Sequence, residues 1–339
     1  MASDNSHITS LLNIVTAKKR PSLDALNARA IYKKRYAYNQ NQGVGLKFFI
    51  SIIIIFFSSY GIASNESINL GSGKFTIKGG KGHSEKKIDV YYHLPISHDE
   101  NTKVLIVIPG SGRNGWSYRD SWVEASEKYN VLILSPSYSE KSYPRFWNYN
   151  IARMLSNVKI NKAKSAIESY TVVSDSNEWI FSDFDRVFNY SVSKLSLTAK
   201  KYDMFGHSAG GQILHRLALF DFKNKANRIL ASNSGWYTVP TFKENFPYGL
   251  NKGVSTLENI RLAFKSKLTI FLGELDNEHE TRGHLVRNPQ LDIQGTYRLS
   301  RGKHFFKKSK ELASNLNVKS NWNIHVVQGI GHDYKNMGK

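Results

Sequence analysis

Short apolar runs recur along the chain after residue 64 and alternate with segments of helical periodicity. A strand covered on both faces has no polar side, so a continuous run rich in Val, Ile and Leu predicts a buried strand of a parallel sheet. Residues 87–94 alternate between apolar and polar positions, which also predicts a strand. The continuous runs lie at 103–108 and 131–134, and further segments with strand character lie at 202–205, 228–231, 268–272 and 322–327.

Helical patterns fall between these runs, at residues 117–129 and 212–220. Strand and helix patterns that alternate in this way predict a doubly wound α/β domain with a mostly parallel sheet, which we place at residues 64–339. Two stretches, 137–177 and 236–260, fit the alternation poorly and are rich in aromatic and turn-forming residues. We expect substrate-binding loops there.

A separate apolar segment precedes this domain. Residues 48–57 follow Lys47 and are almost entirely Ile and Phe, and small residues follow up to Ala63. This pattern is typical of a secretory signal with its cleavage site. The polar, basic residues 1–43 are too long for an ordinary signal, so we expect either a true start near Val44 or a disordered cytoplasmic tail on a signal anchor at 44–63.

Both versions of the segment predict export. Residues 64–339 would lie outside the cytoplasm, periplasmic, extracellular or membrane-anchored, with membrane contact only through residues 46–63 when the segment is uncleaved. The alternative is that the apolar run is a buried strand of a cytoplasmic protein.

The charge and the cysteine content of the chain exclude several classes of function. Residues 1–63 hold eight of the 47 Lys and Arg and two of the 27 acids, which leaves a net charge of +14 on the rest. The basic clusters are short and lack the aromatic signatures of RNA-binding modules, so we expect no nucleic-acid partner. The absence of cysteine excludes disulfides, a thiolate metal site and a cysteine nucleophile.

The sequence GHSAG at 206–210 has the form Gly-x-Ser-x-Gly. It follows a predicted strand and opens a predicted helix, which is the setting of a nucleophile elbow. Glycines are needed there because Ser208 would occupy a strained turn, and side chains at 206 and 210 would collide with the neighbouring strand and helix. The pattern predicts Ser208 as a nucleophile, whereas the alternative is an ordinary Gly-rich turn at a helix start.

A serine nucleophile needs a histidine base and an acid that orients it, and in this fold they follow the serine in the order acid, then histidine. Asp276 lies just after the predicted strand 268–272, and His332 lies in a Gly-flanked loop after the last strand. We predict Asp276 as the acid, with Glu274 in reserve, and His332 as the base.

The tetrahedral intermediate also needs backbone donors. One is the N–H of Ala209, and the glycine-rich loop after residue 108 makes Ser111 or Gly110 the expected second donor. A phosphate-cradling loop is the alternative, but the segment lacks the Gly-Lys-Ser/Thr ending of a P-loop.

The other histidines have different expected places. His325 lies inside a predicted strand and is expected to be packed, and His207 is expected to shape the elbow. His279, His284 and His304 lack the spacing of a helical zinc site. We therefore predict no catalytic metal and no cofactor.

With these motifs together, residues 87–334 resemble α/β-hydrolase esterases, in particular the polyhydroxybutyrate-depolymerase-like group of secreted or periplasmic members. The resemblance implies the α/β-hydrolase fold and action on carboxylic esters. The long aromatic segment 137–177 departs from the common pattern of that fold. The segments that carry the resemblance are IPGSG at 108–112, GHSAGGQ at 206–212, GWYTVP at 235–240, GELD at 273–276 and GIGHD at 329–333.

Taken together, the sequence predicts a serine hydrolase that cleaves small-molecule or polymeric carboxylic esters through an acyl-enzyme. A serine peptidase or an acyltransferase on the same residues is one alternative, because one fold and one triad host several chemistries. A non-catalytic envelope-binding protein is the other, and it predicts no covalent labelling of Ser208.

Overall fold

Among residues 67–163 and 166–339, which the computed structural model describes, eight strands form the main sheet. Their order is β1-β2-β4-β3-β7-β8-β9-β10. From β4 to β10 neighbouring strands are parallel, whereas β2 is antiparallel to both of its neighbours. The strands are β1 (Gly71–Lys78), β2 (Lys87–Leu94), β3 (Lys103–Ile108), β4 (Val131–Ser137), β7 (Tyr202–His207), β8 (Ala226–Ser232), β9 (Leu268–Gly273) and β10 (Asn323–Val327).

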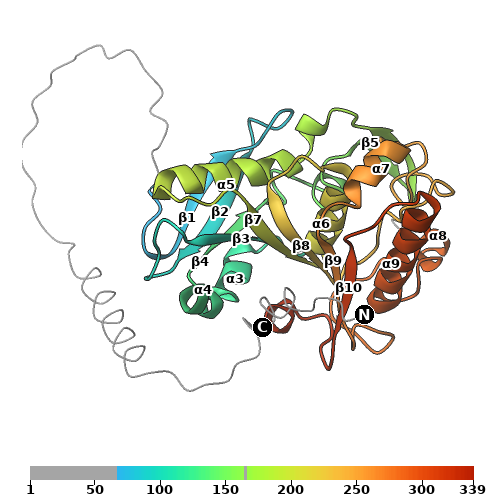
Figure 1. The fold of residues 1–339 in the computed structure, drawn as a ribbon. Coiled ribbons are helices and arrows are strands. Elements are labelled where there is room, and N and C mark those ends of the chain that lie inside the picture. Colours follow the sequence, from blue (N-terminus) through green and yellow to red (C-terminus); the bar gives the residue numbers. More distant parts are fainter. Residues whose placement is uncertain (1–66, 164–165) are drawn as a thin grey trace, which may run out of the picture. The chain divides into compact units, whose positions relative to one another are not determined.

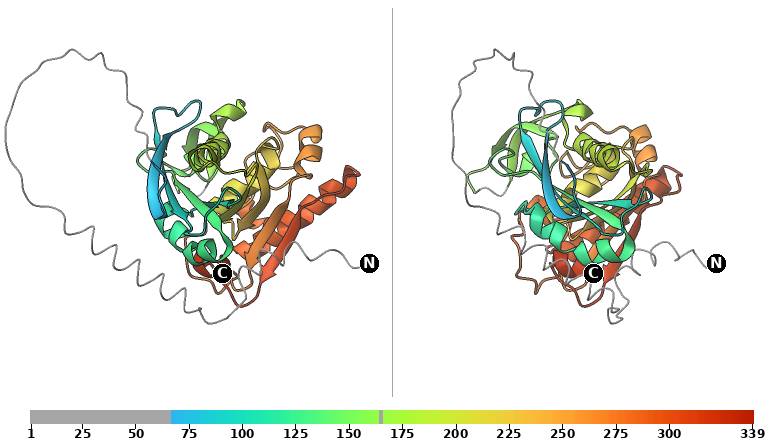
Figure 2. Two further views of the ribbon diagram at one scale, coloured as in Figure 1. Left: turned by 60° about the vertical axis from the view of Figure 1, so that its left-hand side comes forward. Right: turned by 90° about the vertical axis from the view of Figure 1, so that its left-hand side faces the viewer.

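Helices cover both faces of this sheet (Figures 1 and 2). In β3, Ile106 and Ile108 join a large core with α5, α6 and α9, whereas Leu105 and Val107 join a smaller core with α3, α4 and α10. The continuous apolar sequence of β3 follows from this double burial, because successive side chains point to opposite faces. The helices are α3 (Gly115–Asp120), α4 (Val123–Tyr129), α5 (Phe181–Leu195), α6 (Ala209–Phe220), α7 (Leu257–Ala263), α8 (Pro289–Asp292), α9 (Arg298–Asn315) and α10 (Tyr334–Met337).

The edge strand β1 has a polar, glycine-containing sequence, and nothing in the apolar pattern predicted it. It pairs with β2 over its full length and buries Phe75 completely. A Cβ at Gly73 would lie 2.3 Å from the hydroxyl oxygen of Tyr92 on β2. Glycine in this strand therefore makes room for the tyrosine ring across the pair.

The segment after β4 leaves the main sheet and returns to it at α5. It contains the short 3-10 helices Phe146–Asn148 and Ser176–Glu178 and a separate antiparallel pair, β5 (Leu155–Ile160) and β6 (Ile167–Val172). Tyr170 on β6 donates its hydroxyl hydrogen to the carbonyl oxygen of Phe246. The two stretches that fitted the sequence pattern poorly, 137–177 and 236–260, are thus in direct contact.

The structure confirms the predicted strands of the mostly parallel sheet. One predicted helix is wrong. Residues 117–129 are not one helix: α3 and α4 are separated at Ser121 and Trp122. Ser121 Oγ donates to the carbonyl oxygen of Tyr118 at 2.7 Å, and such a local bond competes with helix continuation. The 137–177 stretch carries the β5–β6 pair, and α5 and α9 were not predicted.

The predicted leader at 1–43 and the predicted signal or anchor at 44–63 lie outside the described residues. Within the part of the chain that the structure does describe, no helix has the length and apolar character needed to span a membrane.

Candidate active site

The helix α6 follows the strand β7 near the middle of the sheet (Figure 1). Ser208 is the residue between them, since β7 ends at His207 and α6 begins at Ala209. Its backbone has φ 59° and ψ −113°, a conformation that non-glycine residues rarely adopt. The turn is fixed from both sides, because the Ser208 N–H donates to the Ser232 carbonyl oxygen at 2.9 Å and its own carbonyl accepts from Gln212. The side chain is thereby presented at the carboxyl end of the central strand β7.

Glycines on both sides of Ser208 make this turn possible. A Cβ at Gly206 would lie 2.6 Å from the Gly210 carbonyl oxygen, and one at Gly210 would lie 2.2 Å from the Ile108 carbonyl oxygen. Real Cβ atoms do not approach backbone oxygens so closely, so larger residues would displace β3 or α6. The predicted steric role of these two glycines is confirmed.

Asp276 and His332 lie in the loops after β9 and β10, two adjacent parallel strands. Oδ2 of Asp276 is 2.7 Å from Nδ1 of His332. Both side chains are nearly inaccessible to solvent, with 1% and 7% exposure. This contact leaves Nε2 as the imidazole atom that is free of the carboxylate.

Two further side chains bind the Asp276 carboxylate, and the sequence analysis missed both. Asn233, directly after β8, donates from Nδ2 to Oδ2 at 2.6 Å. Arg298, the first residue of α9, donates from Nη1 to Oδ1 at 3.2 Å. The position of Asn233 at a strand end could have been noticed, whereas no local sequence signal links Arg298 to an acid 22 residues earlier.

The reserve acid, Glu274, is bound elsewhere. Its Oε2 accepts the backbone N–H of Gly329 at 2.9 Å, so it holds the loop that leads to the histidine. The structure brings Asp276, and not Glu274, into contact with the His332 ring.

His207 is fully buried beside this pair. Its ring centroid is 4.4 Å from that of His332, and its Nδ1 is 3.4 Å from the hydroxyl of Tyr118. Burial, with help from the neighbouring His332, holds the pKa of His207 well below its ordinary value, so the ring is neutral. Tyr118 in turn stacks on Tyr334 at 4.0 Å, which fixes the chain just after the histidine.

The segment 277–284 packs against the other side of His332. Glu280 Oε2 accepts the backbone N–H of His332, and Arg282 binds Glu280 at 2.7 Å and Asp333 at 3.4 Å. The hydrogen bond from Arg282 lowers the pKa of Glu280 to about 2. Gly283 has φ 69°, which favours glycine, and a Cβ there would make a tight contact of 3.3 Å with His332 Nε2.

Of the predicted oxyanion residues, Gly110 lies close to Ser208, because a Cβ at Gly110 would be 3.5 Å from the Ser208 Cβ. Ser111 is exposed on the same loop. Ala209 is the first residue of α6, where a backbone N–H has no acceptor within the helix. The loop is fixed from behind, because the Tyr149 hydroxyl donates to the Pro109 carbonyl oxygen at 2.7 Å.

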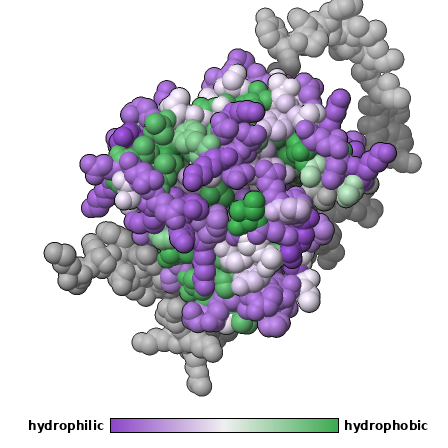
Figure 3. Space-filling view, turned by 90° about the vertical axis from the view of Figure 1, so that its right-hand side faces the viewer, coloured by the Kyte–Doolittle hydropathy of each residue, from purple (hydrophilic) through white to green (hydrophobic). Residues whose placement is uncertain are grey.

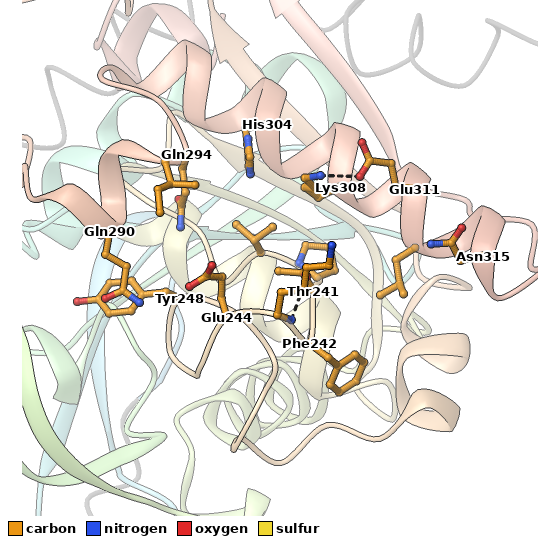
Figure 4. Close-up of a pocket in the computed structure, with 15 residues that line it drawn as sticks. Thr241, Phe242, Glu244, Tyr248, Gln290, Gln294, His304, Lys308, Glu311 and Asn315 are labelled. Carbon is orange, nitrogen blue, oxygen red and sulfur yellow. Dashed lines mark hydrogen bonds and ion pairs between the residues drawn. The ribbon is translucent and has the colours of Figure 1, made fainter.

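The remaining histidines have other places. His325 stacks on Phe271 at 5.3 Å, and burial lowers its pKa. His279 is exposed, and His304 lines a cavity of about 490 Å³ between α8, α9 and residues 239–248 (Figure 4). Neither Ser208 nor His332 lines that cavity. Within residues 67–163 and 166–339 no cluster of three or more His, Asp or Glu is placed to hold a metal.

A mostly parallel sheet between two layers of helices, with a serine on a strained turn between a strand and a helix, defines the α/β-hydrolase fold class. No protein-family model and no curated protein sequence matches the chain.

Two solved structures match it closely. Poly(aspartic acid) hydrolase-1 from Sphingomonas sp. KT-1 is 30% identical with a TM-score of 0.69, over 80% of this chain and 96% of that one. The poly(3-hydroxybutyrate) depolymerase from Bordetella parapertussis is 26% identical with a TM-score of 0.70, over 80% of this chain and 88% of that one. The chain belongs to the α/β-hydrolase superfamily, among its esterase-like and polyhydroxybutyrate-depolymerase-like enzymes, and is a hydrolase.

Proposed function

We propose that the protein is a serine hydrolase of carboxylic esters, with Ser208 as nucleophile, His332 as general base and Asp276 as the orienting acid. The observation that carries this proposal is the buried 2.7 Å contact between Asp276 and His332. The strained elbow at Ser208 supports it, because the ring of the adjacent His207 lies 4.4 Å from that of His332. An acid that binds Nδ1 fixes the tautomer in which Nε2 can accept a proton.

In the proposed reaction, Ser208 Oγ attacks the ester carbonyl carbon while its proton passes to His332 Nε2. Asp276 stabilises the imidazolium that forms, and the oxyanion receives N–H donors from Ala209 and from Gly110 or Ser111. Collapse of the intermediate expels the alcohol, which takes the proton from Nε2. Water then cleaves the acyl-enzyme by the same route, so no cofactor or metal is required.

The decisive variant is Ser208→Ala. It should lower ester turnover by a factor on the order of 10³ or more, because covalent catalysis is lost while backbone donors remain. It should also abolish labelling by a fluorophosphonate probe without changing thermal stability. A variant that retains wild-type turnover would show that the nucleophile is another residue.

A second candidate substrate class is an anionic polymer joined by amide bonds. Two observations favour it: the net charge of +14 on residues 64–339, and the 30% identity to a protein described as a poly(aspartic acid) hydrolase. A basic surface raises the local concentration of an anionic polymer. One face of the molecule is largely hydrophilic, with separate apolar patches (Figure 3).

Salt separates the two substrate classes. Hydrolysis of poly(aspartic acid) should fall steeply as ionic strength rises from about 50 to about 500 mM, because screening weakens surface attraction. Hydrolysis of a neutral acyl ester at the same Ser208 should change little. If the protein hydrolyses the ester but not poly(aspartic acid), the carboxylic-ester assignment stands and the anionic polymer is excluded as a substrate.

We also propose that residues 64–339 act outside the cytoplasm. The support is the sequence of residues 44–63, with an apolar core and small residues before Ser64. Fractionation with amino-terminal sequencing should find either soluble exported protein that starts near Ser64 or membrane-bound protein with an accessible body. Soluble cytoplasmic protein that begins at Met1 would contradict both forms.

A further inference from the structure

We propose that Arg298 is a positioning residue of this site, which sets the orientation of the Asp276 carboxylate and tunes the pH range in which His332 acts as a base. The inference rests on the proposed function. It adds a charged partner to the acid that the reaction itself does not require.

The contacts of Arg298 all converge on the acid–base pair and its surroundings. Nη1 donates to Asp276 Oδ1 at 3.2 Å, which is the carboxylate oxygen that His332 does not use. Nη2 donates to the carbonyl oxygens of Gly283 and His284, at 3.3 and 3.2 Å. One guanidinium therefore joins the carboxylate to the segment that packs on the His332 ring.

The backbone at the start of α9 strengthens this connection. The N–H of Leu299 donates to the carbonyl oxygen of Asp276 at 3.0 Å. Side-chain and backbone donors of the first helical turn thus bind both ends of the same aspartate. Because Asp276 is 1% exposed and Arg298 is 3% exposed, water cannot replace these donors without opening the site.

Charge predicts the direction of the effect on pH. Arg298 is a fixed positive charge close to the ring that becomes positive during catalysis, and like charges disfavour each other. The arginine also neutralises part of the carboxylate field that favours the imidazolium. Removing it should make the imidazolium easier to form, so the acidic limb of the pH–rate profile should move to higher pH.

Other ionisable groups face Asp276 and His332, and they are the same in wild type and in the Arg298 variants. From the remaining elements packed against Asp276 and His332 these are His207, Tyr237, Glu280, Arg282 and Asp333. His207 is held neutral by burial, and Glu280, Arg282 and Asp333 pair with one another. A shift seen on changing Arg298 alone is therefore assigned to that residue.

The same helix supplies a matched control. Arg301 is also fully buried, and it donates to the carbonyl oxygens of Gly295, Gly235 and Val286. Its carboxylate partner is Asp292 at 3.2 Å, not Asp276. Arg301→Gln removes an equally buried guanidinium that holds loops in the same way but does not touch the acid.

The experiment compares Arg298→Gln, Arg298→Lys, Arg301→Gln and wild type in kcat/KM for an acyl ester across pH, in thermal stability and in fluorophosphonate labelling. Arg298→Gln should move the midpoint of the acidic limb to higher pH than in wild type, because a nearby positive charge is lost. It should lower kcat about tenfold to a hundredfold, with KM little changed, because the acid loses its fixed orientation.

Arg298→Lys should restore most of the position of the acidic limb, because lysine returns the positive charge. It should restore less of kcat, because lysine cannot bind the carboxylate and both carbonyl oxygens together. Arg301→Gln should lose stability with the limb unmoved. An unmoved limb in Arg298→Gln, with stability lowered as in Arg301→Gln, would overturn the inference and leave a merely structural arginine. If instead wild type takes up no probe, the proposed serine mechanism itself fails, so the two failures are distinguishable.

Discussion

The proposed site has two sides that are held by different kinds of interaction. The nucleophile side is Ser208 with its elbow, and the acid–base side is Asp276 with His332. Ser208 is held by backbone contacts: glycines at 206 and 210 let the turn close against β3 and α6, and the Ser232 carbonyl binds its N–H. Asp276 and His332 are held by side chains, two of them charged: Arg298 and the neutral Asn233 bind the carboxylate, and Glu280 binds the backbone N–H of the histidine.

Because the interactions differ, the two sides should be sensitive to different changes. Close backbone packing depends on volume, so the nucleophile side should be sensitive to added atoms and insensitive to pH and salt. Ion pairs depend on protonation, so the acid–base side should respond to pH even where no atom is added. Each of the following substitutions addresses one side.

Among the following substitutions, the largest effect is expected on the acid–base side. Asp276→Asn should lower ester kcat by a factor on the order of 10³, because an amide favours the wrong imidazole tautomer. Glu274→Gln should change kcat by no more than a few-fold, since the Glu274 carboxylate binds Gly329 and Gln328 and not the His332 ring. Steady-state kinetics of both variants give the answer, and equal mild losses would mean that the acid comes from another residue.

The next effect tests packing at the elbow. Gly210→Ala should destabilise the fold by about 1–3 kcal/mol or more, because its Cβ would lie 2.2 Å from the backbone oxygen of Ile108. Gly112→Ala is the matched control, because its Cβ meets only the movable Asn114 carboxamide, at 3.2 Å. Urea unfolding midpoints measure both. Equal stability of the two variants would contradict a backbone-packed nucleophile side.

The smallest effect concerns pH. The pKa of Glu280 is lowered to about 2 from 4.5, so its ionised form stabilises the folded protein above the ordinary value, and this contribution is lost as pH falls from about 4.5 towards 2. Glu280→Gln should therefore have a lower Tm than wild type near neutral pH, and the difference should shrink over that acidic interval. If the difference in Tm between wild type and Glu280→Gln stays constant with pH, ionised Glu280 does not stabilise the acid–base side.

The sequence was informative wherever a residue and its neighbours in the chain determine the structure. The strand at 103–108 was predicted from its apolar run, because burial on both faces leaves no polar position. The elbow at Ser208 was predicted because its glycines and the flanking strand and helix are adjacent in sequence. The places of Asp276 and His332 were predicted from strand ends, since parallel strands end at one edge of the sheet.

Features that depend on distant residues were not predicted. The edge strand β1 has little apolar character because only Gly71 and Phe75 of its 8 residues are buried, and α9 was overlooked because its sequence is rich in Lys and Arg. The partnership of Arg298 with Asp276 arises only when α9 packs beside β9. Charge alone could not identify it, because the chain holds 47 Lys and Arg.

The contacts between the two long loops have a consequence for redesign of the proposed substrate-binding loops. Tyr149 in the first loop binds the backbone of Pro109 after β3, Tyr170 binds the backbone of Phe246 in the second, and Arg216 on α6 connects Asn150 with Thr238. A graft that replaced one loop alone would leave hydrogen-bonding groups on the other loop or on α6 without their partners. Loop exchange between relatives should therefore move 137–177 and 236–260 as a single cassette, together with the arginine between them.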